Sequence, residues 1–336
     1  MRRTRHFVQR YYPNDRVIGP GGASIPVRFP DPHVAAVTYS LDEVLPGFFD
    51  AFKDALAPDT GPPELTLARY ETSRYLATEP GGVVAEAALT GLIRSGLLKR
   101  FESSAHAFKK TAEKMATSRG VFLEGLEHGV VLTSQGIEEW QGTDSDESLD
   151  GLFATGEAVP ASAFRLEDLA RDVRSDQLLL SKFAERAALI TRTNDPKLDS
   201  LKAELLKILA AAGQDGLNEV DKRNKCKVII FSFFADTARW ICDFLEGLFE
   251  ADIRFANYRG RMACVVGEDG SNGISRTSAV FGFAPESTEA PAGRREDVYD
   301  VLEHYSFRCS SIAGISSSLA VRSGKRSNRH ERTPPP

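Results

Sequence analysis

Apolar residues recur at helical spacing over most of the chain between residues 42 and 212, and this pattern constrains the fold more than any other. In the first such segment, Leu45, Phe48 and Phe52 fall on one face of the expected helix. Proline and glycine clusters separate several of the segments. The pattern predicts a mostly helical region with helices over 42–56, 65–76, 83–101, 104–127, 164–190 and 198–212.

Local signals bound the fourth of these helices. Ser103 or Ser104 precedes it, and a serine hydroxyl at this position accepts a hydrogen bond from the first turn of a helix. Gly129 follows it, and glycine adopts the left-handed backbone that commonly ends a helix. Ahead of all the helices, Val34–Tyr39 is apolar enough to form a short strand.

An acidic segment, residues 129–163, interrupts the helical pattern. It contains neither lysine nor arginine, whereas Asp144, Asp146 and Glu147 lie close together among serine and glycine. Such a composition is typical of a solvated loop. We therefore expect a mobile acidic loop here rather than a binding site.

The helices expected over 164–190 and 198–212 allow two arrangements. Their apolar residues follow a heptad-like register that Asp176 breaks once, so they could pair as an antiparallel helical arm and bind a partner protein. They could equally lie as ordinary amphipathic helices on a globular core. The pattern alone leaves both arrangements open.

The character of the chain changes at Lys225. Residues 227–232 form a continuous apolar run of the kind buried in parallel sheets, and a helix is expected over 235–249. A second strand over 262–266 and a helix over 275–281 would extend this into a doubly wound α/β unit, but no further repeat follows. Residues 303–336 are rich in serine, arginine and proline, which predicts disorder. The expected fold class is mixed α and α/β.

Composition narrows the classes of function. The net charge of −5 means that any affinity for nucleic acid must come from local basic patches. The four cysteines lack the spacing of a zinc or redox motif, and we expect no bound metal. Cys226 and Cys242 lie in apolar surroundings and are expected to be buried thiols, which fits a reducing cytoplasm. No stretch approaches the roughly 20 apolar residues that span a membrane.

Three blocks in order resemble Swi/Snf-like superfamily II helicases. The first is Met-Arg-Arg-Thr-Arg-His-Phe-Val at 1–8, and the second is 65–76 with Leu-Leu-Lys-Arg-Phe-Glu-Ser-Ser at 97–104 and its continuation at 122–129. The third joins Asp-Pro-Lys-Leu at 195–198 to Lys-Val-Ile-Ile-Phe-Ser at 227–232. The resemblance is to a bacterial subfamily with a helical spacer between its two motor lobes.

The resemblance implies a division of the chain into four parts. Residues 1–33 would be the connector from a missing first motor lobe, and 34–222 the mostly helical spacer. Residues 223–302 would be a partial second RecA-like lobe, the helicase C-terminal domain. Residues 303–336 would be a disordered basic tail, and the abrupt loss of the family pattern after Leu302 suggests a frameshifted reading frame.

The resemblance also implies candidate contacts with nucleic acid. In the family, the loop after the first strand of the second lobe faces nucleic acid, and a helix N-terminus there can bind phosphate, which points to Ser232, Phe233 and Thr237. Lys99 and Arg100 belong to a basic group near the Ser-Ser block that could follow a phosphate backbone or simply face solvent. DNA is favoured over RNA as the partner.

Catalysis by this chain alone is not expected. Motors of this family bind ATP and Mg²⁺ through a Gly-x-x-x-x-Gly-Lys-Ser/Thr loop and an acidic pair, and this chain has no such loop. Asp42 and Glu43 imitate the acidic pair but follow the Arg-Arg-Thr block, whereas in the family the pair precedes it. The second-lobe arginine finger is also missing. We therefore expect an inactive fragment of a nucleic-acid-dependent ATPase with no catalytic residues or cofactor, the alternative being a non-catalytic helical scaffold that binds a protein through 164–212.

Overall fold

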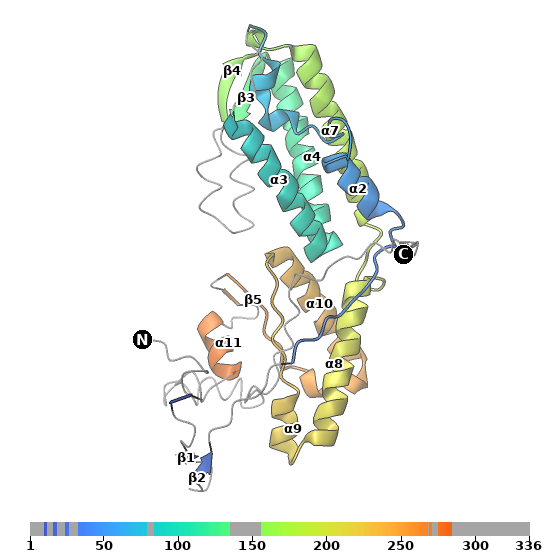
Figure 1. The fold of residues 1–336 in the computed structure, drawn as a ribbon, viewed down its shortest axis with the longest axis vertical. Coiled ribbons are helices and arrows are strands. Elements are labelled where there is room, and N and C mark those ends of the chain that lie inside the picture. The colour runs from blue at the N-terminus through green and yellow to red at the C-terminus, as the bar shows by residue number, and fades with distance from the viewer. Residues whose placement is uncertain are drawn as a thin grey trace, which may run out of the picture.

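The computed structural model describes residues 10–11, 16–18, 24–26, 33–78, 84–134, 156–267, 269–270 and 275–283. This part of the chain is mostly helical (Figure 1). Its strands form three separate antiparallel pairs: β1 (Arg16–Ile18) with β2 (Ser24–Pro26), β3 (Val130–Ser134) with β4 (Gly156–Pro160), and β5 (Val265–Val266) with β6 (Asp269–Gly270).

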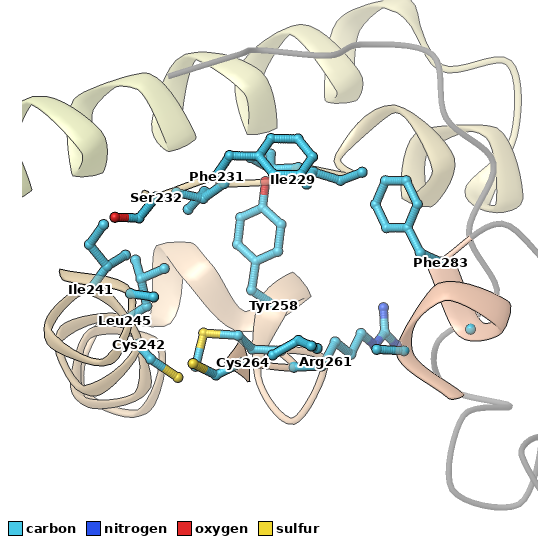
Figure 2. Close-up of a pocket in the computed structure, with 18 of the residues that line it drawn as sticks. Ile229, Phe231, Ser232, Ile241, Cys242, Leu245, Tyr258, Arg261, Cys264 and Phe283 are labelled. Atoms are coloured by element: carbon cyan, nitrogen blue, oxygen red, sulfur yellow. The ribbon is translucent and has the colours of Figure 1, made fainter. Parts of the chain in front are cut away.

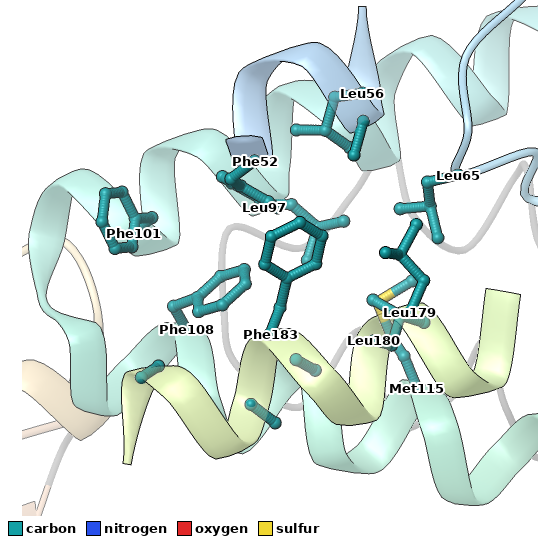
Figure 3. Close-up of a cluster of buried hydrophobic side chains, with 14 of the residues drawn as sticks. Phe52, Leu56, Leu65, Leu97, Phe101, Phe108, Met115, Leu179, Leu180 and Phe183 are labelled. Carbon is teal, nitrogen blue, oxygen red and sulfur yellow. The ribbon is translucent and has the colours of Figure 1, made fainter. Parts of the chain in front are cut away.

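The larger of two helical bodies, here called the large body, contains four α-helices among the described residues. They are α2 (Phe48–Leu56), α3 (Val84–Ser103), α4 (Ala105–Glu127) and α7 (Leu166–Ala187). Helix α4 packs against both α3 and α7. Aromatic rings from all four helices meet in the core, part of which Figure 3 shows, and ring centroids there lie 4.7–6.0 Å apart for the contacts among Phe48, Phe52, Phe101, Phe108 and Phe183.

Only Ser104 separates α3 from α4, and it forms the expected cap. Its side chain accepts a hydrogen bond from the backbone N–H of Ala107 at 3.0 Å. At the other end of α4, Gly129 has a φ of 78°, so the chain leaves the helix through a left-handed residue and enters β3. Both local signals predicted from the sequence are confirmed.

A buried ion pair accounts for the single break in the apolar stripe of α7. The Asp176 carboxylate is fully buried, accepts backbone hydrogen bonds from Thr66 (2.8 Å) and Ala68 (3.1 Å), and lies 3.7 Å from Arg119 Nε. Burial raises the pKa of Asp176, while the Arg119 charge and the hydrogen bonds lower it. Asp176 therefore joins α7, α4 and the segment around residues 66–68.

The second helical body, here called the small body, follows α7. It contains α8 (Pro196–Asp215), α9 (Glu219–Lys225), α10 (Ala235–Ala251), the 3₁₀-helix η4 (Ile253–Tyr258) and α11 (Arg276–Phe283). Its core is separate from that of the large body and is built from the buried side chains of Leu201, Leu205, Ala212, Cys226, Leu245, Phe249, Phe255 and Tyr258. The Tyr258 hydroxyl donates to the Cys226 carbonyl at 2.8 Å and fastens η4 to the end of α9.

The doubly wound sheet expected after Lys225 is not formed within the described residues. The run 227–232 is not a strand, and the expected strand 262–266 reduces to β5, whose partner β6 is antiparallel. The two segments line opposite sides of one cavity (Figure 2), so they cannot hydrogen-bond to each other as neighbouring strands would. Residues 34–39 likewise form no strand. The helices expected over 235–249 and 275–281 are confirmed as α10 and α11.

One expectation for the helices was wrong, and the structure decides between the two arrangements left open for residues 164–212. Residues 65–76 form two 3₁₀-helices, η1 (Ala68–Tyr70) and η2 (Thr72–Tyr75). A continuous helix cannot form here because Leu67 has a left-handed φ of 59°. The N–H groups of its neighbours Thr66 and Ala68 donate to Asp176. The antiparallel arm does not exist, since α7 packs on α4 whereas the buried leucines of α8 belong to the small body. Figure 1 shows α7 and α8 following one another along the long axis. Ordinary amphipathic helices on globular cores are confirmed instead.

The remaining expectations meet the structure only in part. The expected helix 42–56 begins at Phe48, after a turn in which Gly47 takes a left-handed φ of 62°. The ends of the acidic segment form β3 and β4 and a short 3₁₀-helix, η3 (Ala161–Ala163), while 135–155 lie outside the described residues. The tail 303–336 and most of the connector 1–33 also lie outside them.

Replacing Asp176 with alanine is expected to lower the free energy of unfolding by about 3–5 kcal/mol, because it leaves the buried Arg119 charge without its counterion. Urea denaturation followed by circular dichroism measures this. Asp168→Ala on the same helix is the matched control, since its ion pairs with Arg165 and Arg171 are exposed and contribute at most about 1 kcal/mol. Equal losses in the two variants would contradict the role assigned to Asp176.

Candidate nucleic-acid interface at the junction of the two bodies

The N-terminus of α10 meets the α3–α4 turn through three hydroxyl groups. Thr237 Oγ1 hydrogen-bonds to Ser103 Oγ and to Ser104 Oγ, each at 2.8 Å, and all three side chains are buried. Ser104 still accepts the capping bond from Ala107. The turn between two helices of the large body is thus fixed to the first turn of a helix in the small body.

Charged side chains surround these hydroxyls. Asp236, in the first turn of α10, binds Lys110 Nζ at 2.6 Å and lies 3.8 Å from Arg100 Nη1. The Arg100 guanidinium also lies over the Phe234 ring, 4.6 Å from its centroid. A carboxylate is favourable at a helix N-terminus. Asp236 therefore occupies the position at which this helix could otherwise have bound a phosphate, and its negative charge disfavours one.

Trp240 is the aromatic centre of the junction. Its ring stacks on His106 of α4 with centroids 4.3 Å apart, and the Arg192 guanidinium lies 4.6 Å from its centroid. Its indole N–H donates to Asp195 Oδ2 at 2.9 Å. Asp195 also caps α8 by accepting from the backbone N–H of Lys197. Contacts from α4, α10 and the start of α8 therefore converge on one ring.

Asp195 is buried and Lys197 is half-buried, and their opposite charges lie beside the Ser-Ser turn. Lys197 Nζ donates to the carbonyl of Ser103 at 2.6 Å. Burial lowers the pKa of Lys197, and the charge of Asp195 opposes this. Burial raises the pKa of Asp195, and the hydrogen bond from Trp240 opposes that. The Asp-Pro-Lys-Leu block and the Leu-Leu-Lys-Arg-Phe-Glu-Ser-Ser block thus contact each other.

The five residues proposed from the sequence fall into two groups. Arg100 and Thr237 are buried, at 5% and 2% exposure, and hold the junction together. Lys99 is exposed, and Phe233 is 58% exposed on the loop before α10. Ser232 is half-buried and donates to the Phe234 carbonyl at 3.2 Å. The structure therefore leaves Lys99 and Phe233 with the access that a nucleic acid would require.

Sequence reasoning missed several residues that shape this surface. Phe231 is 66% exposed beside Phe233, although the apolar run suggested a buried strand. Nothing in the sequence singled out His106 or Trp240, since a stacked pair that joins two helices leaves no local pattern. Asp195 carried one usable signal, because an aspartate before Pro196 is typical of a helix N-cap.

A cavity of about 830 Å³ lies in the small body (Figure 2). Its walls are mostly apolar and come from the run 228–232, helix α10, residues 261–265 and helix α11. Within the described residues, no three histidine, cysteine or acidic side chains come together in a way that could hold a metal ion. Cys226 and Cys242 are buried, as expected from their apolar surroundings.

Replacing Thr237 with valine is expected to destabilise the protein by about 1–3 kcal/mol, because the Ser103 and Ser104 hydroxyls then lose a buried partner. The shape of the side chain is retained, so the change tests the hydrogen bonds. Thr237→Ser keeps the hydroxyl and should cost less. The free energy of urea unfolding is compared for the wild type and the two variants. A valine variant as stable as the wild type would contradict a stabilising role for these hydrogen bonds.

The junction is expected to weaken as the pH falls below about 6.5, the ordinary pKa of histidine. Burial, followed by the positive charge of Lys110, lowers the pKa of His106 in the folded protein. The unfolded chain therefore binds a proton first, and stability is lost between about pH 6.5 and the lower folded pKa.

The measurement is the urea midpoint of unfolding at about pH 7.5 and at about pH 5.5. Trp240 fluorescence reports unfolding in a Trp140→Phe background, in which Trp240 is the remaining tryptophan. His106→Phe keeps an aromatic ring beside Trp240 but cannot titrate. The wild type should lose more stability on acidification than this variant. The same loss in both proteins would show that other groups cause it.

No helix among the described residues is both long and apolar enough to cross a membrane. Comparison of the chain with protein-family models, with curated proteins and with solved structures found no match.

Proposed function

We propose that this chain is the spacer and second-lobe part of a helicase-like, nucleic-acid-dependent ATPase, and that it contacts nucleic acid next to the junction of its two bodies. In this proposal, the intact motor supplies ATP and Mg²⁺ binding, whereas the present chain binds nucleic acid without hydrolysing ATP. We also propose that the small body corresponds to a RecA-like lobe, although its described residues form no parallel sheet.

The observation that carries the proposal is the meeting of blocks that are distant in sequence. Ser103 and Ser104 end the Leu-Leu-Lys-Arg-Phe-Glu-Ser-Ser block, Lys197 belongs to Asp-Pro-Lys-Leu, and Thr237 follows the apolar run 227–232. All four residues touch at one junction. A set of segments that share one contact surface is what a coupling site between a spacer and a motor lobe would require.

The loop before α10 offers a surface suited to bases. Phe231 and Phe233 are each more than half exposed, which is unusual for two large apolar side chains of one short loop. Unpaired bases stack on such rings, and each stack contributes about 1–3 kcal/mol. The Phe233 ring lies 5.0 Å from that of Phe234, which Arg100 holds in place. The loop is therefore anchored while its outer rings remain accessible.

Basic side chains of α3 and α4 could supply phosphate contacts beside this loop. Lys99 is exposed and precedes Arg100, which contacts Phe234. Lys109 is half-buried in an ion pair with Glu113, and Lys110 binds Asp236, so both charges are already engaged. Lys99 is accordingly the phosphate contact that we propose, with single-stranded DNA as the favoured ligand.

In this proposal, Arg100 and Thr237 position the loop and do not touch nucleic acid. The alternative function, a scaffold that binds a protein through residues 164–212, lacks the continuous helical arm on which it was based, because α7 and α8 belong to different bodies. Binding of a protein partner there stays a prediction.

The test is binding of a fluorescein-labelled oligothymidylate, followed by fluorescence anisotropy at several salt concentrations. Replacing both Phe231 and Phe233 with alanine is expected to weaken binding by about 1–3 kcal/mol for each ring, because two stacking platforms are lost. Lys99→Gln is expected to reduce the slope of log affinity against log salt by about 0.7, the value for one phosphate contact to a single strand.

Leu178→Ala is the matched control, since Leu178 is an exposed apolar residue of α7, 72% exposed, in another part of the fold. It should bind like the wild type. If the double phenylalanine variant bound the oligonucleotide as tightly as the wild type does, the loop would not be part of the interface. No measurable, salt-dependent binding by the wild type would sink the proposed function itself.

A further inference from the structure

Two thiols that are distant in sequence face each other at the edge of the cavity in the small body. Cys242 lies on α10 and Cys264 lies in the segment just before β5 (Figure 2). Both side chains line the same cavity, their thiols are within hydrogen-bonding reach of each other, and neither is in a disulfide. The separation in sequence concealed this pair, because redox motifs are recognised by short cysteine spacing.

The surroundings make the two thiols chemically different. Hydrogen bonding with Cys242, whose Sγ also lies 4.0 Å from Glu246 Oε1, lowers the pKa of Cys264, and the nearby charge of Arg239 acts in the same direction. Burial, Glu246 and Asp243 oppose this. The hydrogen bond, followed by burial, raises the pKa of Cys242. A thiolate therefore forms at Cys264 in preference to Cys242.

Access follows the same order as acidity. Cys264 is half-buried, whereas Cys242 is only 9% exposed. An oxidant from solvent would therefore meet Cys264 first. Cys226, the third described cysteine, is buried in the core of the small body, and burial raises its pKa. It lacks the features that favour oxidation and serves as an internal comparison.

We propose that Cys264 and Cys242 form a redox-active pair that a hydroperoxide converts to an intramolecular disulfide. The Cys264 thiolate attacks one peroxide oxygen, the O–O bond breaks, and a sulfenic acid and, after protonation, one water form. Cys242 then loses its proton to water and attacks the Cys264 sulfur, the S–O bond breaks, and hydroxide leaves and is protonated. The two thiols lose two electrons, and hydrogen peroxide is reduced to two waters.

The disulfide would tie α10 to the segment that leads into β5. Cys242 and Cys264 both line the cavity, together with Ile241 and Leu245 of the same helix. The intervening chain includes η4, whose Tyr258 also lines the cavity. Oxidation would therefore fix one wall of the cavity covalently, opposite the wall that carries Phe231.

Tryptic peptide mapping of the full chain after treatment with hydrogen peroxide tests this pairing. Cleavage after Arg239 and Arg261 releases Cys242 in the peptide 240–254 and Cys264 in the peptide 262–276. Under native conditions, these two peptides should be recovered linked, and dithiothreitol should separate them. The same treatment in denaturant should lose this preference and also give links to Cys226 and Cys309, because the fold no longer selects the partner.

Single variants distinguish the two roles. Cys242→Ser should abolish the linked peptides and leave Cys264 as a sulfenic acid that dimedone labels, whereas Cys264→Ser should abolish both the link and the label. Cys226→Ser is the matched control and should oxidise like the wild type.

Two results would overturn the proposal. One is native protein that links Cys242 and Cys264 no more often than denatured protein does. The other is a Cys242→Ser variant whose Cys264 is not labelled, since that variant retains the residue that should react first.

Discussion

Ser104 sets both the shape of the large body and the placement of the small one. Its hydroxyl caps α4 by accepting from Ala107, and the same hydroxyl hydrogen-bonds to Thr237 at the start of α10. A serine cap is a local feature that stabilises one helix end. Here it also fixes the distance between two cores that share no apolar cluster. The loop before α10 and the Trp240 stack lie beside that contact, because both belong to the N-terminal half of the same helix and the segment that precedes it.

Buried charges occur both inside a body and at the junction between the two bodies. Asp176 and Arg119 lie in the interior of the large body, whereas Asp195, next to the half-buried Lys197, lies at the junction. Burying a charge is costly unless hydrogen bonds and a counterion accompany it. Each carboxylate meets this need with backbone N–H groups as well as a cation or an indole. These contacts are directional, so they specify one arrangement of the helices.

Local signals predicted most of the helices, and tertiary contacts decided the rest. Ser104 and the apolar stripes on either side of it are readable because cap and periodicity both lie within a few residues. Residues 227–232 looked like a buried strand, but apolar content does not reveal whether a neighbouring strand is present. Arg100 looked like a phosphate contact because a sequence shows charge without showing burial. Its burial depends on Asp236, which lies 136 positions further on. The exposure of Phe233 depends equally on packing that no local pattern records.

The polar character of the junction has a consequence for how the molecule comes apart. Two cores joined by hydroxyls, ion pairs and a single stacked ring can open as separate cooperative units, because little apolar area is shared between them. The small body, with the smaller core and the cavity, would exchange its amide hydrogens first while α4 stays protected. A translocating protease that pulled from the C-terminal side would therefore meet a weak unit before a strong one, and could release the large body as a folded remnant.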